Sequence, residues 1–177
     1  MDPITAFALS VQNPFLSAAG HALNNDIFFT VLVPALVLLA EWKNDRRLKV
    51  FLLLGLAFVI GFSAKSIVAE PRPCAGAVWC PTDYAFPSDH TVVALALCLG
   101  FLNRKPFPLF LVFALFVAFT RLNLGVHTFG DILGAVPVAL VAYWIVETAW
   151  ARYGRSGPLR SWIIRFAGCQ DASNETL

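Results

Sequence analysis

Apolar residues gather in five long runs along the chain, and shorter polar segments separate them. Several runs are shorter than the roughly 20 residues with which a helix crosses a hydrocarbon core of ~30 Å. A helix can nevertheless continue into bordering polar residues, and a bundle can thin the bilayer around it. The pattern therefore predicts an all-α integral membrane bundle of five or six helices, with about five transmembrane spans. The runs cover Ile27 to Trp42, Leu48 to Ala64, His90 to Leu102, Phe107 to Leu122, and Ile132 to Trp150.

The first 26 residues have a different pattern. They contain no Lys or Arg, so the positively charged part of a secretory signal peptide is missing, and we expect a segment of the mature protein. Its apolar positions recur at helical spacing, but Asn13 and Pro14 interrupt them, which favours an amphipathic helix at the membrane interface over a span. We predict a single domain over 1–177, with an interfacial segment (1–26), a transmembrane core (27–150) and a basic cytoplasmic tail (151–177).

Composition supports a membrane location. Hydrophobic residues make up 58% of the chain, charged residues 14%, and the mean hydropathy is +0.70, which is too apolar for a water-soluble domain of this size. The net charge of +2 is small, and the basic residues form short clusters rather than a continuous stripe. This distribution argues against a nucleic-acid partner.

The positions of Lys and Arg predict the topology. Most of them follow the first, third and fifth apolar runs, so five spans would place them on one side, which the positive-inside rule makes cytoplasmic. The remaining three, Lys65, Arg72 and Arg121, would then lie at the outer face. Cations at that face call for a function, unless their side chains merely extend to the lipid headgroups. The cytoplasmic set is Lys43, Arg46, Arg47, Lys49, Arg104, Lys105, Arg152, Arg155, Arg160 and Arg165.

Two of the outer cations form a first cluster of candidate functional residues. Lys65 and Arg72 are seven residues apart at the end of the second run. A helix that unwinds before Pro71 would bring both side chains toward one point, as the capture of a phosphate dianion requires.

A second cluster, Pro87-Ser88-Asp89-His90, stands where a polar loop meets the third run. Ser88 is a candidate N-cap, so the amides of Asp89 and His90 would point out of a helix N-terminus toward a bound anion. The alternative is a helix cap without chemistry.

The third cluster precedes the last run and contains Arg121, His127 and Asp131. On a helix, residues four apart share a face, so Asp131 could accept a hydrogen bond from His127 and fix its tautomer. The other ring nitrogen would then be a better nucleophile. Alternatively, Asp131 only stabilises the N-terminus of its helix, and His127 is idle.

Together the three clusters resemble the signature of the type 2 phosphatidic acid phosphatases in order and in internal spacing. That signature is Lys, six residues, Arg-Pro; then Pro-Ser-Gly-His; then Ser-Arg, five residues, His, three residues, Asp. The resemblance implies that His127 is the nucleophile, Asp131 orients it and His90 protonates the leaving oxygen. It also implies that Lys65, Arg72, Ser88 and Arg121 bind the phosphoryl group. The matching residues are Lys65, Arg72, Pro73, Pro87, Ser88, His90, Arg121, His127 and Asp131.

Two positions depart from the signature. Thr120 replaces Ser and keeps the hydroxyl, and Asp89 replaces Gly and places a carboxyl group beside the predicted phosphate pocket. The resulting Pro-Ser-Asp-His block is similar to that of the branch that hydrolyses undecaprenyl diphosphate. We therefore expect a polyprenyl diphosphate as substrate, in the cytoplasmic membrane, with the active site on its extracytoplasmic face. The alternatives are phosphatidylglycerophosphate, phosphatidic acid or another lipid phosphate, a lipid-linked phosphotransferase, and a lipid-binding protein without activity.

We expect neither a metal nor another cofactor. The chain has three histidines, His21, His90 and His127, and its carboxylates do not cluster with them at ligand spacing. The partners expected are the phosphorylated lipid and the surrounding membrane lipids, and the sequence does not predict an oligomeric state.

The loop of 74–84 belongs to the same predicted face. Its cysteines, Cys74 and Cys80, either form a disulfide that stiffens the loop over the site or remain two free thiols. Two acids nearby, Glu70 and Asp83, either tune the site or only solvate the loop.

Overall fold

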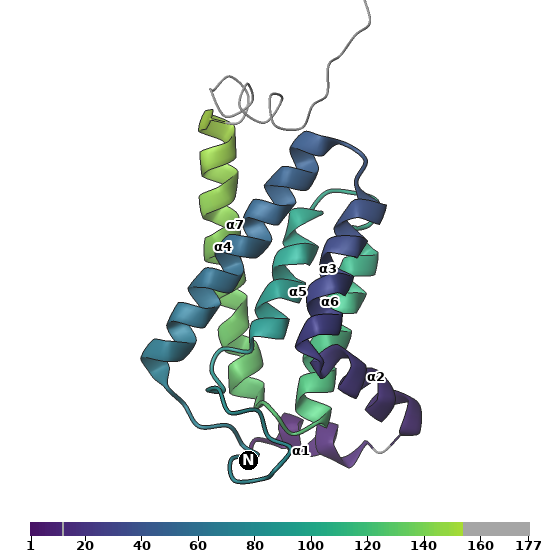
Figure 1. Ribbon diagram of the computed structural model, residues 1–177, viewed down its shortest axis with the longest axis vertical. Helices are drawn as coiled ribbons and strands as arrows, with labels where there is room; N and C mark the ends of the chain where they lie inside the picture. The colour runs from purple at the N-terminus through teal and green to yellow at the C-terminus, as the bar shows by residue number, and fades with distance from the viewer. Residues whose placement is uncertain (12, 154–177) are drawn as a thin grey trace, which may run out of the picture.

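The computed structural model describes residues 1–11 and 13–153, which form seven α-helices and no strand (Figure 1). The prediction of an all-α membrane bundle is confirmed, and each of the five apolar runs coincides with one helix, except that the first and third runs continue two residues past the helix end. Apart from the end of the last helix, the predicted basic tail lies outside the described residues. The helices are α1 (Pro3–Ser10), α2 (Pro14–Asn24), α3 (Asp26–Ala40), α4 (Asn44–Val68), α5 (Asp89–Gly100), α6 (Phe107–Asn123) and α7 (Phe129–Tyr153).

Helix α5 is the centre of the bundle and contacts α3, α4, α6 and α7. Its inward positions include Ala94 and Ala96, which are fully buried. Small side chains allow neighbouring helices to approach closely, which is how membrane helices gain packing energy. The close packing places the first turn of α5 next to the ends of its neighbours.

The connections divide between two ends of the bundle. Residues 41–43 and 101–106 join helices at the upper end in Figure 1, near the basic residues of 43–49 and 104–105. The long loop of 69–88, the turn of 124–128 and helices α1 and α2 lie at the lower end. Lys65, Arg72 and Arg121 are therefore at the end opposite these basic clusters.

The N-terminal segment consists of two helices, where the sequence pattern predicted one. Each begins at a side-chain cap followed by proline: Asp2 accepts a hydrogen bond from the amide of Thr5 (2.8 Å), and Asn13 accepts one from the amide of Phe15 (2.9 Å). Both helices pack on α6, and α2 meets α3 at a bend of 86°. The interruption at Asn13 and Pro14 is thus the start of a second helix. Its place at the membrane interface stays a prediction.

Helices α4 and α7, each of 25 residues, are long and apolar enough to cross a membrane, and the bent pair of α2 and α3 adds a third candidate. Helices α5 and α6 have only 12 and 17 residues. A short helix such as α5 can lie at membrane depth because the protein around it, rather than lipid, surrounds its ends. The predicted total of five spans requires both short helices to cross.

Candidate active site

The five predicted site residues with basic side chains line one pocket of about 740 Å³. They are Lys65, Arg72, His90, Arg121 and His127. They come from the end of α4, the following loop, the start of α5, the end of α6 and the turn before α7. The structure therefore brings residues from three separate sequence clusters to the same pocket.

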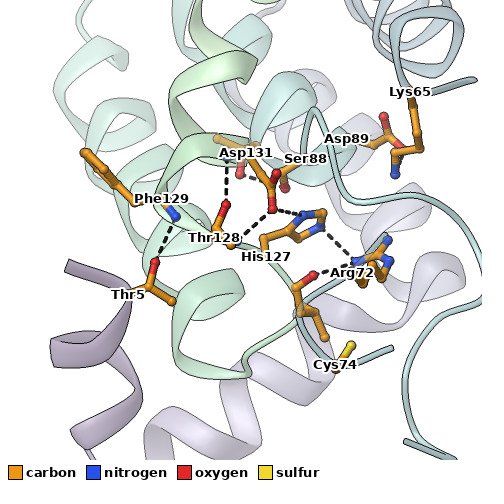
Figure 2. A network of polar contacts seen from close by, with 12 residues as sticks. Thr5, Lys65, Arg72, Cys74, Ser88, Asp89, His127, Thr128, Phe129 and Asp131 are labelled. Atoms are coloured by element: carbon orange, nitrogen blue, oxygen red, sulfur yellow. Dashed lines mark hydrogen bonds and ion pairs between the residues drawn. The ribbon is translucent and has the colours of Figure 1, made fainter. Parts of the chain in front are cut away.

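His127 and Asp131 are in contact, with 3.3 Å between Nδ1 and Oδ2 (Figure 2). The expectation that both lie on a helix was wrong for His127, because α7 begins only at Phe129. Asp131 Oδ2 also accepts a hydrogen bond from the amide of Thr128 (2.7 Å), and Thr128 Oγ1 accepts one from the amide of Asp131 (3.4 Å). Asp131 therefore helps to close the first turn of its helix and contacts the histidine at once.

The second ring nitrogen of His127, Nε2, lies 3.0 Å from Nη1 of Arg72. A guanidinium can only donate hydrogen bonds, so Nε2 must be the unprotonated acceptor. The proton of the neutral ring is then on Nδ1, where Asp131 accepts it. Figure 2 shows this chain from Asp131 through His127 to Arg72. Nε2 is therefore the ring nitrogen with the lone pair that a nucleophile requires, and in the free protein this lone pair accepts the hydrogen bond from Arg72.

Burial keeps His127 neutral. Its side chain is almost fully buried, and this burial lowers the pKa of His127 to about 4. The hydrogen bond with Asp131 opposes that shift, whereas the charge of Arg72 adds to it. The imidazole is consequently uncharged at neutral pH in the free protein.

Lys65 and Arg72 share carboxylate partners. Lys65 Nζ lies 2.7 Å from Asp83 Oδ2 and 2.6 Å from Asp89 Oδ2. Arg72 Nη2 donates to Asp83 Oδ1 (2.7 Å). Burial alone would raise the pKa of Asp83, but the hydrogen bond and charge of Lys65, followed by the charge of Arg72, hold it below its usual value. Asp83, whose role the sequence left open, thus contacts both cations.

Arg121 is anchored from the N-terminal helices. Its buried guanidinium donates to Asn24 Oδ1 (2.8 Å) and to the carbonyl of Gly20 (3.2 Å). Its Nε is buried without a hydrogen-bond partner among the described residues. Sequence reasoning missed Asn24 and Gly20, because contacts across about a hundred residues leave no local signal.

His90 lies in the first turn of α5 and lines the pocket. Its Nε2 is 3.6 Å from Asp26 Oδ1, and its ring lies 4.6 Å from that of Phe29, centroid to centroid. Neither neighbour was among the predicted site residues. Ser88 is at the N-cap position as expected, but its side chain does not cap the helix, and its Oγ accepts a hydrogen bond from Thr91 Oγ1 (3.1 Å). Ser88 is fully buried.

The loop of 69–88 is fastened at two places. Cys74 and Cys80 form a disulfide with a Cα–Cα distance of 5.6 Å, and the amide of Ala85 donates to the carbonyl of Glu70 (2.8 Å).

Among residues 1–11 and 13–153, no three His, Cys, Asp or Glu side chains converge to hold a metal ion.

A family model for the PAP2 superfamily matches residues 46–155, which is more than half of the chain. The chain belongs to the PAP2 superfamily. It is 33% identical over 127 residues to undecaprenyl-diphosphatase BcrC of Bacillus subtilis, covering 64% of this chain and 65% of that protein. It is 29% identical over 153 residues to sphingosine-1-phosphate phosphatase 2 of Mus musculus, covering 77% of this chain but 42% of that protein.

Two crystal structures share the fold. LpxE of Aquifex aeolicus has a TM-score of 0.69 at 18% identity, covering 82% of this chain and 93% of its own. The transmembrane PAP2 type phosphatidylglycerolphosphate phosphatase of Bacillus subtilis has a TM-score of 0.64 at 20% identity, covering 86% and 85%. With its two or three candidate spans, the chain is a multi-pass membrane protein.

The PAP2 match includes all of the predicted site residues but not the N-terminal helices. Gly20, Asn24 and Asp26, which contact Arg121 and His90, precede the matched region. In this PAP2 chain, some of the residues that contact the site therefore lie outside the region that the family model matches.

Proposed function

We propose that this PAP2 protein is a membrane lipid phosphatase that hydrolyses a polyprenyl diphosphate of the undecaprenyl type to the monophosphate and inorganic phosphate. The observation that carries the proposal is the arrangement at His127. Asp131 holds one ring nitrogen, and the other faces a pocket lined by Lys65, Arg72 and Arg121. A site built only to bind phosphate has no need of an oriented nucleophile.

The reaction would proceed in two steps. Nε2 of His127 forms a bond to the terminal phosphorus as the bond from that phosphorus to the bridging oxygen breaks. The leaving lipid monophosphate takes a proton held by His90. Water then attacks the phosphohistidine and gives a proton to His90, and the Nε2–phosphorus bond breaks to release inorganic phosphate. The cations stabilise the charge on the transferring group.

The shape of the pocket supports a lipid substrate. From the charged residues it continues between α3, α4 and α5, where its lining is apolar. A hydrocarbon chain buried there would gain about 0.8 kcal/mol for each CH₂ group. The apolar lining residues are Phe29, Val33, Pro34, Phe51, Leu54, Phe58, Phe62 and Val93.

Two observations favour a diphosphate headgroup. Asp89 gives the Pro-Ser-Asp-His block its resemblance to the undecaprenyl-diphosphatase branch, and BcrC is among the similar proteins. A second candidate is a long-chain lipid monophosphate, because sphingosine-1-phosphate phosphatase 2 matches a longer part of this chain. The two candidates differ in the leaving group, which is a phosphate monoester in one and an alcohol in the other.

We place the site on the extracytoplasmic face of the cytoplasmic membrane. Basic residues of 43–49 and 104–105 lie at the opposite end of the bundle, which the positive-inside rule assigns to the cytoplasm. The disulfide between Cys74 and Cys80 lies on the site's side and suits an oxidising compartment.

The proposal is tested by phosphate release from the purified protein in detergent, with a chelator present. The panel contains prenyl diphosphates, prenyl monophosphates, a sphingoid phosphate and glycerophospholipid phosphates. We expect the fastest release from a long prenyl diphosphate, with no loss of rate in the chelator. Preference for the monophosphates would favour the second candidate, and equal release by the parent and His127→Ala would end the proposal.

A further inference from the structure

A carboxylate of the protein bridges two cations that the family resemblance assigns to the phosphoryl group. The two oxygens of Asp83 join the two cations of the first sequence cluster. Oδ2 accepts from Lys65 Nζ (2.7 Å), while Oδ1 accepts from Arg72 Nη2 (2.7 Å) and Nε (3.2 Å). A carboxylate that bridges a lysine and an arginine in this way has the charge and the oxygen spacing of part of a phosphate group.

Most of the hydrogen-bond donors of the Arg72 guanidinium already have partners. This guanidinium has five N–H donors. Its Nη1 is engaged by the carbonyl of Val126 (3.1 Å) and by His127 Nε2 (3.0 Å), and its Nε and Nη2 are engaged by Asp83. Phosphoryl oxygens can therefore form the paired bonds that arginine favours only by taking the place of Asp83 or His127. Asp83 holds Nε and Nη2, two of the three guanidinium nitrogens, so a pair of phosphoryl oxygens on these two nitrogens must displace Asp83.

Asp83 is also the carboxylate that is free to leave. Asp89, the other partner of Lys65, belongs to the first turn of the central helix α5, and its side chain is 19% exposed. The Asp83 side chain is 48% exposed and belongs to the loop of 69–88. That loop is fastened near Asp83 by the bond between Ala85 and Glu70, so a local shift of Asp83 suffices, without opening of the whole loop.

We propose that Asp83 occupies the phosphate subsite of the free enzyme, exchanges with phosphoryl oxygens when substrate binds, and returns as inorganic phosphate leaves. The inference rests on the proposed function of the same site. A subsite that is open for only a fraction of the time binds its ligand more weakly by that fraction. By competing for Lys65 and Arg72, Asp83 would thereby speed the release of inorganic phosphate from a pocket that contains three cations.

The test is the affinity of the purified protein for inorganic phosphate, measured calorimetrically without turnover. We compare the parent with Asp83→Asn and Asp83→Ala, and with Glu70→Gln as the matched control. Glu70 is an exposed acid of the same loop whose side chain makes no ion pair among the described residues. Thermal unfolding of each variant checks that it is folded.

We expect both Asp83 variants to bind phosphate about tenfold more tightly than the parent, with a matching fall in KM for the lipid substrate, and Glu70→Gln to bind like the parent. If Asp83 instead positions Lys65 and Arg72, its variants bind phosphate more weakly. Weaker or equal binding by folded Asp83 variants overturns the inference. It leaves the proposed function intact, because release of phosphate from lipid by the parent decides that separately.

Discussion

The guanidinium of Arg72 lies 3.0 Å from Nε2 of His127, on the side of the ring opposite Asp131. Arg72 donates to Nε2, and Asp131 receives the proton of Nδ1, so the two neighbours fix one neutral tautomer between them. The same contact covers the nucleophilic lone pair until a substrate arrives. Attack therefore requires Arg72 to turn from the ring toward the phosphoryl oxygens, which couples binding of the anion to exposure of the nucleophile.

Loss of the two site histidines should have unequal effects. We expect His127→Ala to release no phosphate from a prenyl diphosphate, because no other group can form the intermediate. His90→Ala should retain part of the activity, since the leaving phosphate monoester is acidic and needs little help from a proton donor. The control is His21→Ala, an exposed histidine of α2. Equal losses for His90 and His127 in a phosphate-release assay would contradict the assigned roles.

Asp131→Asn separates orientation of the ring from capping of the helix. An asparagine oxygen can still accept the amide of Thr128, so we expect a loss of stability of only about 1 kcal/mol or less. Without the carboxylate the favoured tautomer is lost, and kcat should fall by about 10²- to 10⁴-fold. Thermal unfolding and kcat are measured on the same preparation. A kcat within a few fold of the parent would mean that Asp131 is only a helix cap.

The pH dependence follows from the environment of His127. Burial lowers its pKa to about 4, and a lowered pKa favours the neutral, nucleophilic form. The imidazole of the free protein should therefore stay neutral through pH 6.5, where an exposed histidine is half protonated, and gain its proton only near pH 4. Nitrogen-15 chemical shifts of the His127 ring, followed during a pH titration, give the midpoint. A midpoint near 6.5 would show that the ring is solvated.

The N-terminal helix should support the nucleophile from a distance. Thr5 of α1 accepts a hydrogen bond from the amide of Phe129 (2.9 Å), directly after the turn that carries His127 and Thr128 (Figure 2). We expect Thr5→Ala to lower kcat about tenfold with KM unchanged, because a small displacement of a reacting group is costly.

Thr5→Ser keeps the hydroxyl and should restore kcat. Ser10→Ala, which removes an exposed hydroxyl bonded only to Phe7 of its own helix in the described structure, should leave kcat unchanged. Similar kcat values for the parent and Thr5→Ala would show that α1 does not help to position His127.

The sequence predicted the parts of this molecule that have a local signal. Apolar runs located α3 to α7, because an apolar segment in a membrane forms a helix to satisfy its backbone hydrogen bonds, whatever its neighbours are. The spacing of basic and histidine residues located the site. By contrast, the split between α1 and α2 was missed, although Asn13 and Pro14 together are a recognisable helix start.

The missed contacts are those made across the fold. Asn24 reaches Arg121 and Asp26 approaches His90 only because α2 and α3 meet at a sharp bend beside the site. Asp83 was noticed, but its two cationic partners depend on how the loop of 69–88 brings Asp83 to Lys65, at the end of α4, and to Arg72. Spacing along the chain carries no information about such contacts.

The central claim is that Nε2 of His127 forms a covalent bond to phosphorus. Rapid acid-free quenching of the parent with a prenyl diphosphate radiolabelled in its terminal phosphate tests it most directly. The account predicts transient label on the protein, stable in alkali and labile in acid, in the peptide that contains His127, and none in His127→Ala. Hydrolysis by the parent without labelled protein, or label that persists in His127→Ala, would contradict it.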